Sequence, residues 1–420
     1  MKGNSILFKN VNVIDCDNER TFNGDVLVEG NRIKKVAEGA GSILGDADTR
    51  VIEGNGRTLM STLCDAHTHL SWNSGDLDFV QNMPVEEHML VCVESAKKYI
   101  DAGYTMCVGA ASAKNRLDIV IRDAINAGRF PGPRYLANAM ELATSNGLLL
   151  PKASNIVDGV DQVRKVAREI IGSGVDMIKL ILSGEEITTR VWAQQTFFDD
   201  DEVAVVVKEA HRCGVRVAAH ARSAESIKMC LRNGVDIIYH ASYIDEEGMD
   251  MMEAKKDTVF VAPGLNWITS TLEDAGQFGY SSELAEKVGY KRELENAIRG
   301  LTEMKKRGIK ILPGGDYGFL WTPHGTYAKD LQIFVERLGF STMDTIRAAT
   351  VYGGEIMNMP NDLGKVKEGY LADLLLVDGD PLKDITILQD KKKLHGIMKD
   401  GAFHKDPITV GTVYEELVEA

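Results

Sequence analysis

Cysteine, long apolar runs and excess positive charge are all scarce in this sequence. Its 420 residues include 6 cysteines. None of them forms a Cys-x-x-Cys pair, so we expect reduced, buried thiols rather than disulfides or a thiolate zinc site. No uninterrupted apolar stretch is long enough to span a bilayer, and the first residues run into an alternating strand pattern instead of a signal-peptide core. These absences predict a cytoplasmic protein with no membrane partner.

The charge balance excludes a second class of partner. Lys and Arg number 48 against 62 Asp and Glu, which gives a formal net charge of −14. A protein that binds nucleic acid needs basic surface to neutralise phosphates. We therefore expect a small-molecule substrate, no nucleic-acid partner, and a homo-oligomer as the assembly.

Strand-like and helix-like segments alternate through the middle of the chain. Eight segments read as strands: 59–67, 105–110, 134–138, 177–182, 215–221, 236–241, 259–263 and 309–313. Several of the intervening helical stretches end at a glycine, where a helix C-cap is expected. Alternation of this kind predicts an α/β fold, namely a (β/α)8 TIM barrel over residues 59–359.

Short β segments separated by turns occupy both ends of the chain. They fall within residues 6–54 at the N-terminus and within 372–377 and 395–398 near the C-terminus. Neither end holds enough strands for a stable sheet of its own. We therefore predict one small β-sandwich domain built from residues 1–58 and 360–420.

Metal-capable side chains follow several of the predicted strands. His67 and His69 are two residues apart, so an extended strand turns both to one face, where they can bind one cation. The further candidates are Lys179, His220, His240 and Asp316. Because the C-terminal strand ends form the active face of such a barrel, these side chains are predicted to meet there.

Most of these candidates also have an ordinary structural explanation. A lone histidine at a strand end is commonly a hydrogen-bonded core residue, and Asp316 after two glycines can form a turn. Lys179 is different, because the residues around it are apolar and a buried ammonium group is costly without an opposite charge. The occurrence of all six at strand ends favours one metal site.

The motifs resemble the amidohydrolase superfamily, and within it the branch of metal-dependent prolidase-like and carboxypeptidase-like amide hydrolases. The resemblance extends over most of the chain. The matching segments are 65–70, 131–134, 175–179, 217–221, 234–240, 314–316 and 369–374.

The resemblance implies a site for two divalent metal ions, taken here as zinc. The two histidines of the first motif and Asp316 would bind the more buried ion, and His220 and His240 the more exposed one. Lys179, carboxylated on its amine, would bridge them. A carbamate is an anionic oxygen ligand, so the carboxylation also removes the uncompensated charge of the buried lysine.

Two cations that share a water lower its pKa and generate a metal-bridging hydroxide near neutral pH. That hydroxide can attack an amide-type C–N bond, as in an N-acyl amino acid, a dipeptide, or an aryl amide or urea. Asp316 is the candidate that takes up the proton and passes it to the departing nitrogen. The exposed ion, held in part by His240, would polarise the carbonyl, so His240 joins Asp316 as a catalytic candidate.

Substrate-binding candidates lie just beyond the predicted strand ends. Arg222 follows a metal-candidate histidine by two residues, and its fork of donors suits a carboxylate. Aromatic residues at similar positions predict a bulky, partly aromatic pocket, although such residues also serve as core. The other candidates are Trp72, Trp267, Trp321, Tyr243 and His324.

Other functions stay open. A deaminase or a cyclic-amide hydrolase of the same superfamily would share the barrel, but deaminases typically lack the buried strand-four lysine and have a glutamate where this sequence has Ser223. A scaffold without catalysis is disfavoured because every ligand is present. An iron-dependent redox enzyme with the same ligand set is a further alternative, since His and carboxylate ligands suit several metals.

Overall fold

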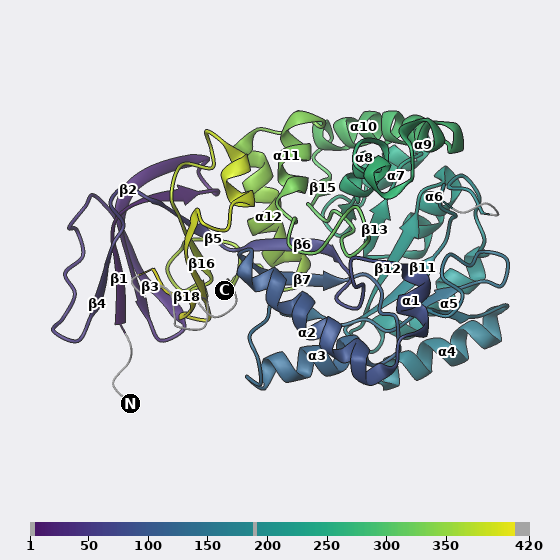
Figure 1. Ribbon diagram of the computed structural model, residues 1–420, viewed down its shortest axis with the longest axis horizontal. Helices are drawn as coiled ribbons and strands as arrows, with labels where there is room; N and C mark the ends of the chain where they lie inside the picture. The colour runs from purple at the N-terminus through teal and green to yellow at the C-terminus, as the bar shows by residue number, and fades with distance from the viewer. Residues whose placement is uncertain (1–4, 188–190, 408–420) are drawn as a thin grey trace. The chain divides into compact units, whose positions relative to one another are not determined.

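The computed structural model describes residues 5–187 and 191–407. By its internal contacts the chain divides into two compact units (Figure 1). One comprises residues 1–63, 100–105 and 341–420, and the other residues 64–99 and 106–340. We call them the terminal unit and the catalytic-face unit and treat each separately. No helix of the described residues is long and apolar enough to cross a membrane.

Strands from both chain ends form the sheet of the terminal unit. Its order is β18-β17-β16-β5-β1-β2-β3, with β4 paired to β1. The strands are β1 (Ser5–Asp15), β2 (Arg20–Glu29), β3 (Arg32–Glu38), β4 (Arg50–Glu53), β5 (Thr58–Ser61), β16 (Leu374–Val377), β17 (Leu394–Lys399) and β18 (Ala402–Lys405). Inward-facing residues such as Phe8, Val26 and Leu374 form its core.

The expected β-sandwich over residues 1–58 and 360–420 is not shown by this sheet. β5 pairs with β1 on one side and with β16 on the other. Both edges of β5 are therefore used, and the strands of the two chain ends are hydrogen-bonded into one continuous sheet. Helices α12 (Thr342–Ile356) and η2 (Ile385–Gln389) also belong to this unit.

Each of the eight predicted strand segments of the middle region contains a strand. They are β5 with β6 (Leu63–Thr68), then β7 (Tyr104–Gly109), β8 (Arg134–Leu136), β11 (Met177–Ile181), β12 (Arg216–Ala221), β13 (Ile237–His240), β14 (Phe260–Ala262) and β15 (Lys310–Ile311). Two short strands were not predicted: β9 (Glu141–Ala143) and β10 (Ser154–Ile156). The segment 59–67 divides because β5 and β6 belong to different sheets.

The predicted closed barrel appears as two sheets. One has the order β10-β9-β11-β12-β13-β14-β15 and the other β6-β7-β8. Few backbone hydrogen bonds cross the two seams. One runs from Ala66 N to Pro313 O at 3.0 Å, and two reach Ala137 O, from Asp176 N at 2.9 Å and from Met177 N at 3.2 Å. The strands at the seams are short, since β15 has 2 residues and β8 has 3. They are too short to form a ladder that joins the sheets.

Helices alternate with these strands, as the sequence pattern predicts. They are α1 (Leu77–Asn82), α2 (Val85–Asp101), α3 (Leu117–Asn126), α4 (Val160–Gly172), α5 (Asp200–His211), α6 (Ala224–Asn233), α7 (Glu246–Glu253), α8 (Leu265–Glu273), η1 (Ala275–Phe278), α9 (Ser282–Val288), α10 (Tyr290–Lys306) and α11 (Lys329–Glu336). Local signals set their ends. Ser223 caps α6 by accepting a hydrogen bond from Ser226 N, and Gly234 ends the same helix with a left-handed φ of 80°.

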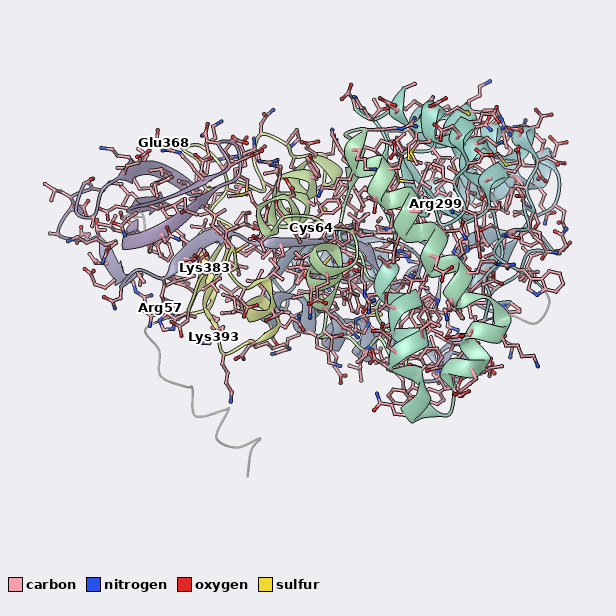
Figure 2. All side chains as sticks on the ribbon, turned by 90° about the horizontal axis from the view of Figure 1, so that it is seen from above. Arg57, Cys64, Arg299, Glu368, Lys383 and Lys393 are labelled. Carbon is pink, nitrogen blue, oxygen red and sulfur yellow. The ribbon has the colours of Figure 1, made fainter. Side chains whose placement is uncertain are left out.

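Cys64, labelled in Figure 2, lies on β6 next to the first metal motif. Its side chain is buried, and burial raises the pKa of the thiol well above its ordinary value. A thiol that stays protonated is a poor nucleophile and a poor metal ligand. The structure thus favours a packing role for Cys64.

Candidate metal centre and its pocket

All six metal candidates line one pocket of the catalytic-face unit, with a cavity volume of about 120 Å³. β6 ends beside His69, and Lys179 lies within β11. The two middle histidines are on neighbouring parallel strands, since Ala221 of β12 pairs with His240 of β13. Asp316 follows β15. The structure therefore brings together residues that lie far apart in the sequence, from His67 to Asp316.

The first three candidates form a tight cluster. His69 Nε2 lies 3.0 Å from Asp316 Oδ1, and His67 Nε2 lies 3.6 Å from the same oxygen. One ligand atom from each of the three residues lies within 4.8 Å of the others. His69 Nδ1 lies 3.2 Å from the carbonyl oxygen of Ala111, which leaves Nε2 directed at Asp316. Two imidazoles and a carboxylate in this arrangement suit one divalent cation.

The other three candidates lie beside this cluster. The ring centroids of His220 and His240 are 4.4 Å apart. His220 Nε2 lies 2.9 Å from the carbonyl oxygen of Gly184, so that nitrogen serves as a donor and Nδ1 remains as the ligand atom. Lys179 Nζ lies 4.2 Å from the centroid of the Tyr239 ring. Within the described part of the chain, no carboxylate pairs with this ammonium group at ion-pair distance.

The protonation states match those of metal ligands. Burial lowers the pKa of three of the histidines: His67, His220 and His240. Burial also lowers the pKa of Lys179 to about 8, against the attraction of Glu141. Burial alone would raise the pKa of Asp316, but the neighbouring imidazoles and Lys179 hold it below its ordinary value. Neutral imidazoles, an ionised carboxylate and an easily deprotonated amine are the forms that bind divalent ions.

Unsatisfied nitrogens and backbone strain also mark this site. The Nδ1 atoms of His67 and His240 are buried without a hydrogen-bond partner. His240 has φ of 73° and Asp316 has φ of 60°. Each such non-glycine residue costs on the order of 1–3 kcal/mol, and such strain concentrates at functional sites. A bound cation would offset part of this cost, so the residues present fit a metal centre.

Gly314 explains why the last metal motif begins with glycine. A Cβ atom at this position would lie 2.8 Å from the backbone nitrogen of His67. That distance is shorter than any ordinary contact, so only glycine lets the segment before Asp316 pass so close to β6. The motif 314–316 thus has a packing reason in addition to its metal candidate.

Aromatic and aliphatic side chains form the wall of the pocket. Trp72 stacks on His69 with ring centroids 4.9 Å apart and an interplanar angle of 7°. Trp267 packs on Phe319 at 4.5 Å. The remaining apolar lining residues are Leu77, Leu149, Leu150, Ile181 and Ile187. The structure thus places two of the three predicted tryptophans, Trp72 and Trp267, at the pocket.

Arg222 lies outside this lining, which corrects its predicted contact with a substrate carboxylate. Its side chain is 0% exposed. The guanidinium contacts the carboxylates of Glu185 and Glu293, and Ser242 Oγ donates to Glu293 at 2.7 Å. Attraction to the two glutamates holds the pKa of Arg222 above its ordinary value despite burial. The guanidinium is therefore engaged by internal carboxylates rather than presented to a ligand.

Three other predicted substrate contacts also lie outside the lining. Tyr243 donates its hydroxyl to Glu186 at 3.3 Å. The indole Nε1 of Trp321 donates to Thr271 Oγ1 at 2.9 Å, and Trp321 lines a separate cavity. His324 Nε2 lies 2.9 Å from the carbonyl oxygen of Trp72. His324 therefore supports the pocket wall from behind.

Two lining carboxylates, Glu141 and Glu185, were missed by the sequence prediction. Burial raises the pKa of Glu185 to about 7 and raises that of Glu141 as well. Glu141 lies on β9, whose 3 residues are too few to show a periodic pattern. Glu185 follows β11 in a loop, where the sequence has no pattern to read.

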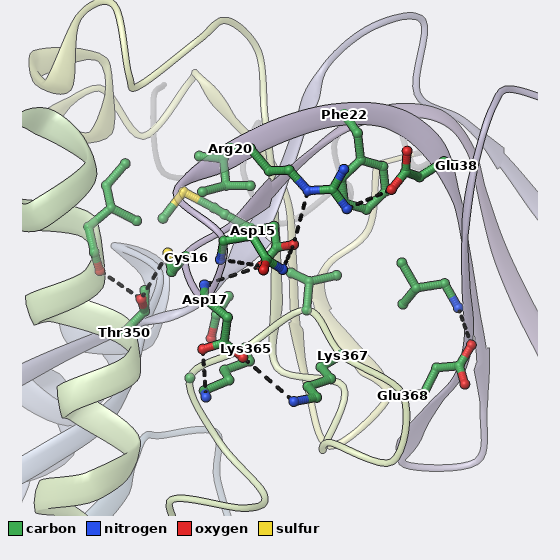
Figure 3. Close-up of a pocket in the computed structure, with 18 residues that line it drawn as sticks. Asp15, Cys16, Asp17, Arg20, Phe22, Glu38, Thr350, Lys365, Lys367 and Glu368 are labelled. Atoms are coloured by element: carbon green, nitrogen blue, oxygen red, sulfur yellow. Dashed lines mark hydrogen bonds and ion pairs between the residues drawn. The ribbon is translucent and has the colours of Figure 1, made fainter.

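A larger cavity in the terminal unit provides a contrast (Figure 3). Its charged side chains pair with one another: Asp17 with Lys365 at 2.7 Å, and Arg20 with Glu38 at 2.6 Å. Burial raises the pKa of Cys16 to about 11. Among the described residues, the metal-type cluster of histidines and carboxylates is found at the other pocket. This cavity is therefore not the candidate active site.

Comparison with known proteins decides the family. The family model described as "Amidohydrolase family" matches residues 58–403, a range that contains all six metal candidates. This chain belongs to the amidohydrolase family. The family assignment expected from the motifs is confirmed.

Individual relatives indicate which branch of the amidohydrolase family this chain resembles. Ochratoxinase from Aspergillus niger is 28% identical over 312 residues, which cover 68% of this chain and 63% of that protein. The chain thus spans less than two thirds of that relative's length. A prolidase complexed with N-methylphosphonate-L-proline is 25% identical, with a TM-score of 0.85 over 96% of this chain and 99% of that chain. A Xaa-Pro dipeptidase with bound methionine has a TM-score of 0.84 at 25% identity, over 96% of this chain and 100% of that one. These relatives agree with the prolidase-like branch of the family.

Proposed function

We propose that this protein is a metal-dependent hydrolase that cleaves an amide-type C–N bond. The observation that carries the proposal is the meeting of six potential ligands from five strand ends in one pocket. The names of the similar proteins support it, because a prolidase and a Xaa-Pro dipeptidase both act on bonds of this type. N-acyl amino acids, dipeptides and aryl amides or ureas are the substrate classes to test.

We assign the residues of this pocket to two divalent ions, with zinc as the expected metal. His67, His69 and Asp316 would hold one ion, and His220 and His240 the other. Lys179, carboxylated on Nζ, would be shared between them. When bound, the ions would supply Lewis acidity to a water and to the scissile carbonyl.

The chain's own residues would handle the proton and exclude solvent. Asp316 is ionised because its imidazole neighbours lower its pKa, so its carboxylate can accept a proton from the attacking water and release it to the departing nitrogen. His69 is oriented by its contact with Ala111 O and by stacking on Trp72. Trp267 and Phe319 would cover the apolar side of the substrate.

The architecture belongs to the same proposal. The two parallel sheets of residues 59–359 would be the two parts of one (β/α)8 barrel, joined at seams that a few backbone hydrogen bonds already bridge. The strands of residues 1–58 and 360–420 would form the accompanying β-sandwich. An experimental structure with metal bound tests both points through the strand pairing at β8 and β15.

Metal analysis and a hydrolysis panel test the function. Purified protein is expected to contain two zinc ions per chain and to release amine from at least one of the three substrate classes. Removal of the metal by a chelator should abolish release, and added zinc should restore it. A fully metal-loaded protein that cleaves none of the classes would contradict the proposal.

A further inference from the structure

The charges of the pocket favour one kind of substrate over another. Apart from the six metal candidates, the polar lining residues of the pocket are Glu141 and Glu185. Arg222, which directly follows β12, is buried against internal carboxylates. The described lining therefore offers no cation to a substrate carboxylate beyond Lys179, and it contains two glutamate carboxylates, of which Glu185 is paired with Arg222.

Glu141 is short of hydrogen-bond donors. It is 5% exposed, and its partner on the neighbouring strand is Ser154, whose Oγ lies 3.1 Å from Glu141 Oε1. The same hydroxyl lies 2.9 Å from the carbonyl oxygen of Leu150. A serine hydroxyl has one hydrogen, and a carbonyl can only accept. When Ser154 donates to Leu150, the carboxylate of Glu141 receives no donor from it.

Glu185, the other glutamate of the pocket lining, has a full set of hydrogen-bond and ion-pair partners. Its Oε1 accepts hydrogen bonds from Tyr290 Oη at 2.9 Å and from the backbone nitrogen of Glu186 at 3.0 Å. Its other oxygen contacts the guanidinium of Arg222. A buried carboxylate normally gathers donors in this way. Glu141 is equally enclosed but has only the Ser154 hydroxyl as a hydrogen-bond donor among the described residues, and because it lines the cavity, a ligand there can supply further donors.

The position of Glu141 specifies where on the substrate those donors would be. Leu180 of β11 pairs with Leu142 of β9, so the preceding residues, Lys179 and Glu141, lie side by side and point to the same face of the two strands. Lys179 belongs to the proposed metal centre, where the scissile carbonyl would be bound. A group that reaches Glu141 must therefore be attached close to that carbonyl.

We propose that Glu141 binds a substrate ammonium group on the carbon next to the scissile carbonyl, so that this protein acts on amides of α-amino acids with a free amino group. The proposal rests on the proposed amide-hydrolase function. The aliphatic residues Leu149 and Leu150 and the aromatic residues of the wall would contact an apolar side chain and an apolar leaving amine. A substrate carboxylate in place of the ammonium group would meet Glu141 as a like charge.

A matched pair of substrates tests this assignment. Leucine p-nitroanilide and 4-methylpentanoyl p-nitroanilide differ only in the α-amino group. The wild-type protein is expected to prefer the first in kcat/KM by at least about tenfold, the scale of one hydrogen-bonded charge contact. The preference should fade above about pH 8, where an α-amino group loses its proton. Titration of enzyme groups that act on both substrates alike cancels in the ratio of the two kcat/KM values.

Glu141→Gln should remove this preference while the volume of the side chain stays the same. KM for the leucine anilide is expected to rise at least about tenfold, with little change for the 4-methylpentanoyl compound. Ser154→Ala serves as the matched control, because it keeps the charge of Glu141 and should retain the preference. Equal losses of Glu141→Gln on both substrates, with a lower zinc content, would show that Glu141 supports the metal centre and would overturn the proposal.

Binding measurements with compounds that cannot be hydrolysed test the ammonium site independently of the proposed hydrolase function. Leucinol and 4-methylpentan-1-ol cannot be hydrolysed, and calorimetry on the zinc-loaded protein is expected to show leucinol binding at least about tenfold tighter, with the difference lost in Glu141→Gln. Such binding, with no hydrolysis of any of the three substrate classes, would overturn the hydrolase function but uphold the ammonium site. Equal binding of the two alcohols would overturn the ammonium site, whatever the hydrolase assays show.

Arg190 provides the remaining comparison, since it lies outside the described residues and close in sequence to Ile187 of the lining. N-benzoyl-phenylalanine has a free carboxylate and no ammonium group. Faster cleavage of this compound than of leucine p-nitroanilide, with the advantage lost in Arg190→Met, would assign carboxylate specificity to the pocket and overturn the proposal.

Discussion

The two cavities of this protein differ in how their polar groups are satisfied. The terminal-unit cavity has many charged residues, but Asp17 is paired with Lys365 and Arg20 with Glu38. The pocket of the catalytic-face unit has buried imidazole nitrogens without partners and two potential ligands, His240 and Asp316, on left-handed backbone. The candidate metal centre therefore differs from the terminal-unit cavity in its unsatisfied polar groups and its backbone strain, and not in a larger volume or a larger number of charges.

The largest loss of activity should come from removing Lys179, the proposed shared ligand of the two ions. Lys179→Ala removes the amine that carboxylation requires, and we expect loss of nearly all activity and of most bound metal. Short-chain carboxylic acids added to the variant should restore part of the activity, because they can fill the vacated position with an anionic oxygen ligand. Unchanged zinc content and turnover in the alanine variant would remove Lys179 from the metal centre.

Arg222→Met tests the buried ion-pair network behind the pocket. It leaves Glu185 and Glu293 without their shared cation, and such a loss typically destabilises a protein by about 3–5 kcal/mol. The free energy of unfolding from urea titration measures it. If the variant keeps full stability but fails to bind a substrate that has a carboxylate, the original substrate-binding prediction for Arg222 is right after all.

Asp316→Asn addresses the chemistry with little change in shape. The amide cannot accept and return the proton, so kcat should fall at least roughly 10²-fold, the low end for general acid–base groups. Stopped assays on metal-loaded protein give kcat, and zinc content serves as the control for ligand loss. A wild-type kcat at full metal content would assign the proton transfer to another residue.

The smallest effect is expected in the terminal-unit cavity. Lys365→Met removes a partner of Asp17, whose pKa its lysine neighbours hold below the ordinary 3.8 despite partial burial. The pair lies near the surface, so the loss should be less than about 1 kcal/mol. A lowered carboxylate pKa stabilises the fold above pH 3.8 and the contribution is lost as pH falls, so wild type and variant should converge in acid. A large loss, or any loss of hydrolysis, would give this cavity a function.

The sequence by itself determined where the strands of the middle region lie and which metal-capable side chains meet in one pocket. Helix and strand periodicity locate the strand ends, and parallel strands place their C-terminal ends along one edge, so His67, Lys179, His220 and Asp316 were predicted to meet. The sequence also allows the close approach of β6 to residue 314, because this position is a glycine and no side chain would fit there.

Only the tertiary structure decided which buried polar groups find an ion-pair or hydrogen-bond partner and which remain available to a ligand. Arg222 and Glu293 are 71 residues apart, and no local pattern shows that they meet in the core. Glu141 lies on a strand too short for a periodic signal, and its role depends on where Ser154 and Lys179 come to lie. Periodicity fixes the face on which a side chain lies, but the partner of a buried charge is fixed by the packing of distant segments.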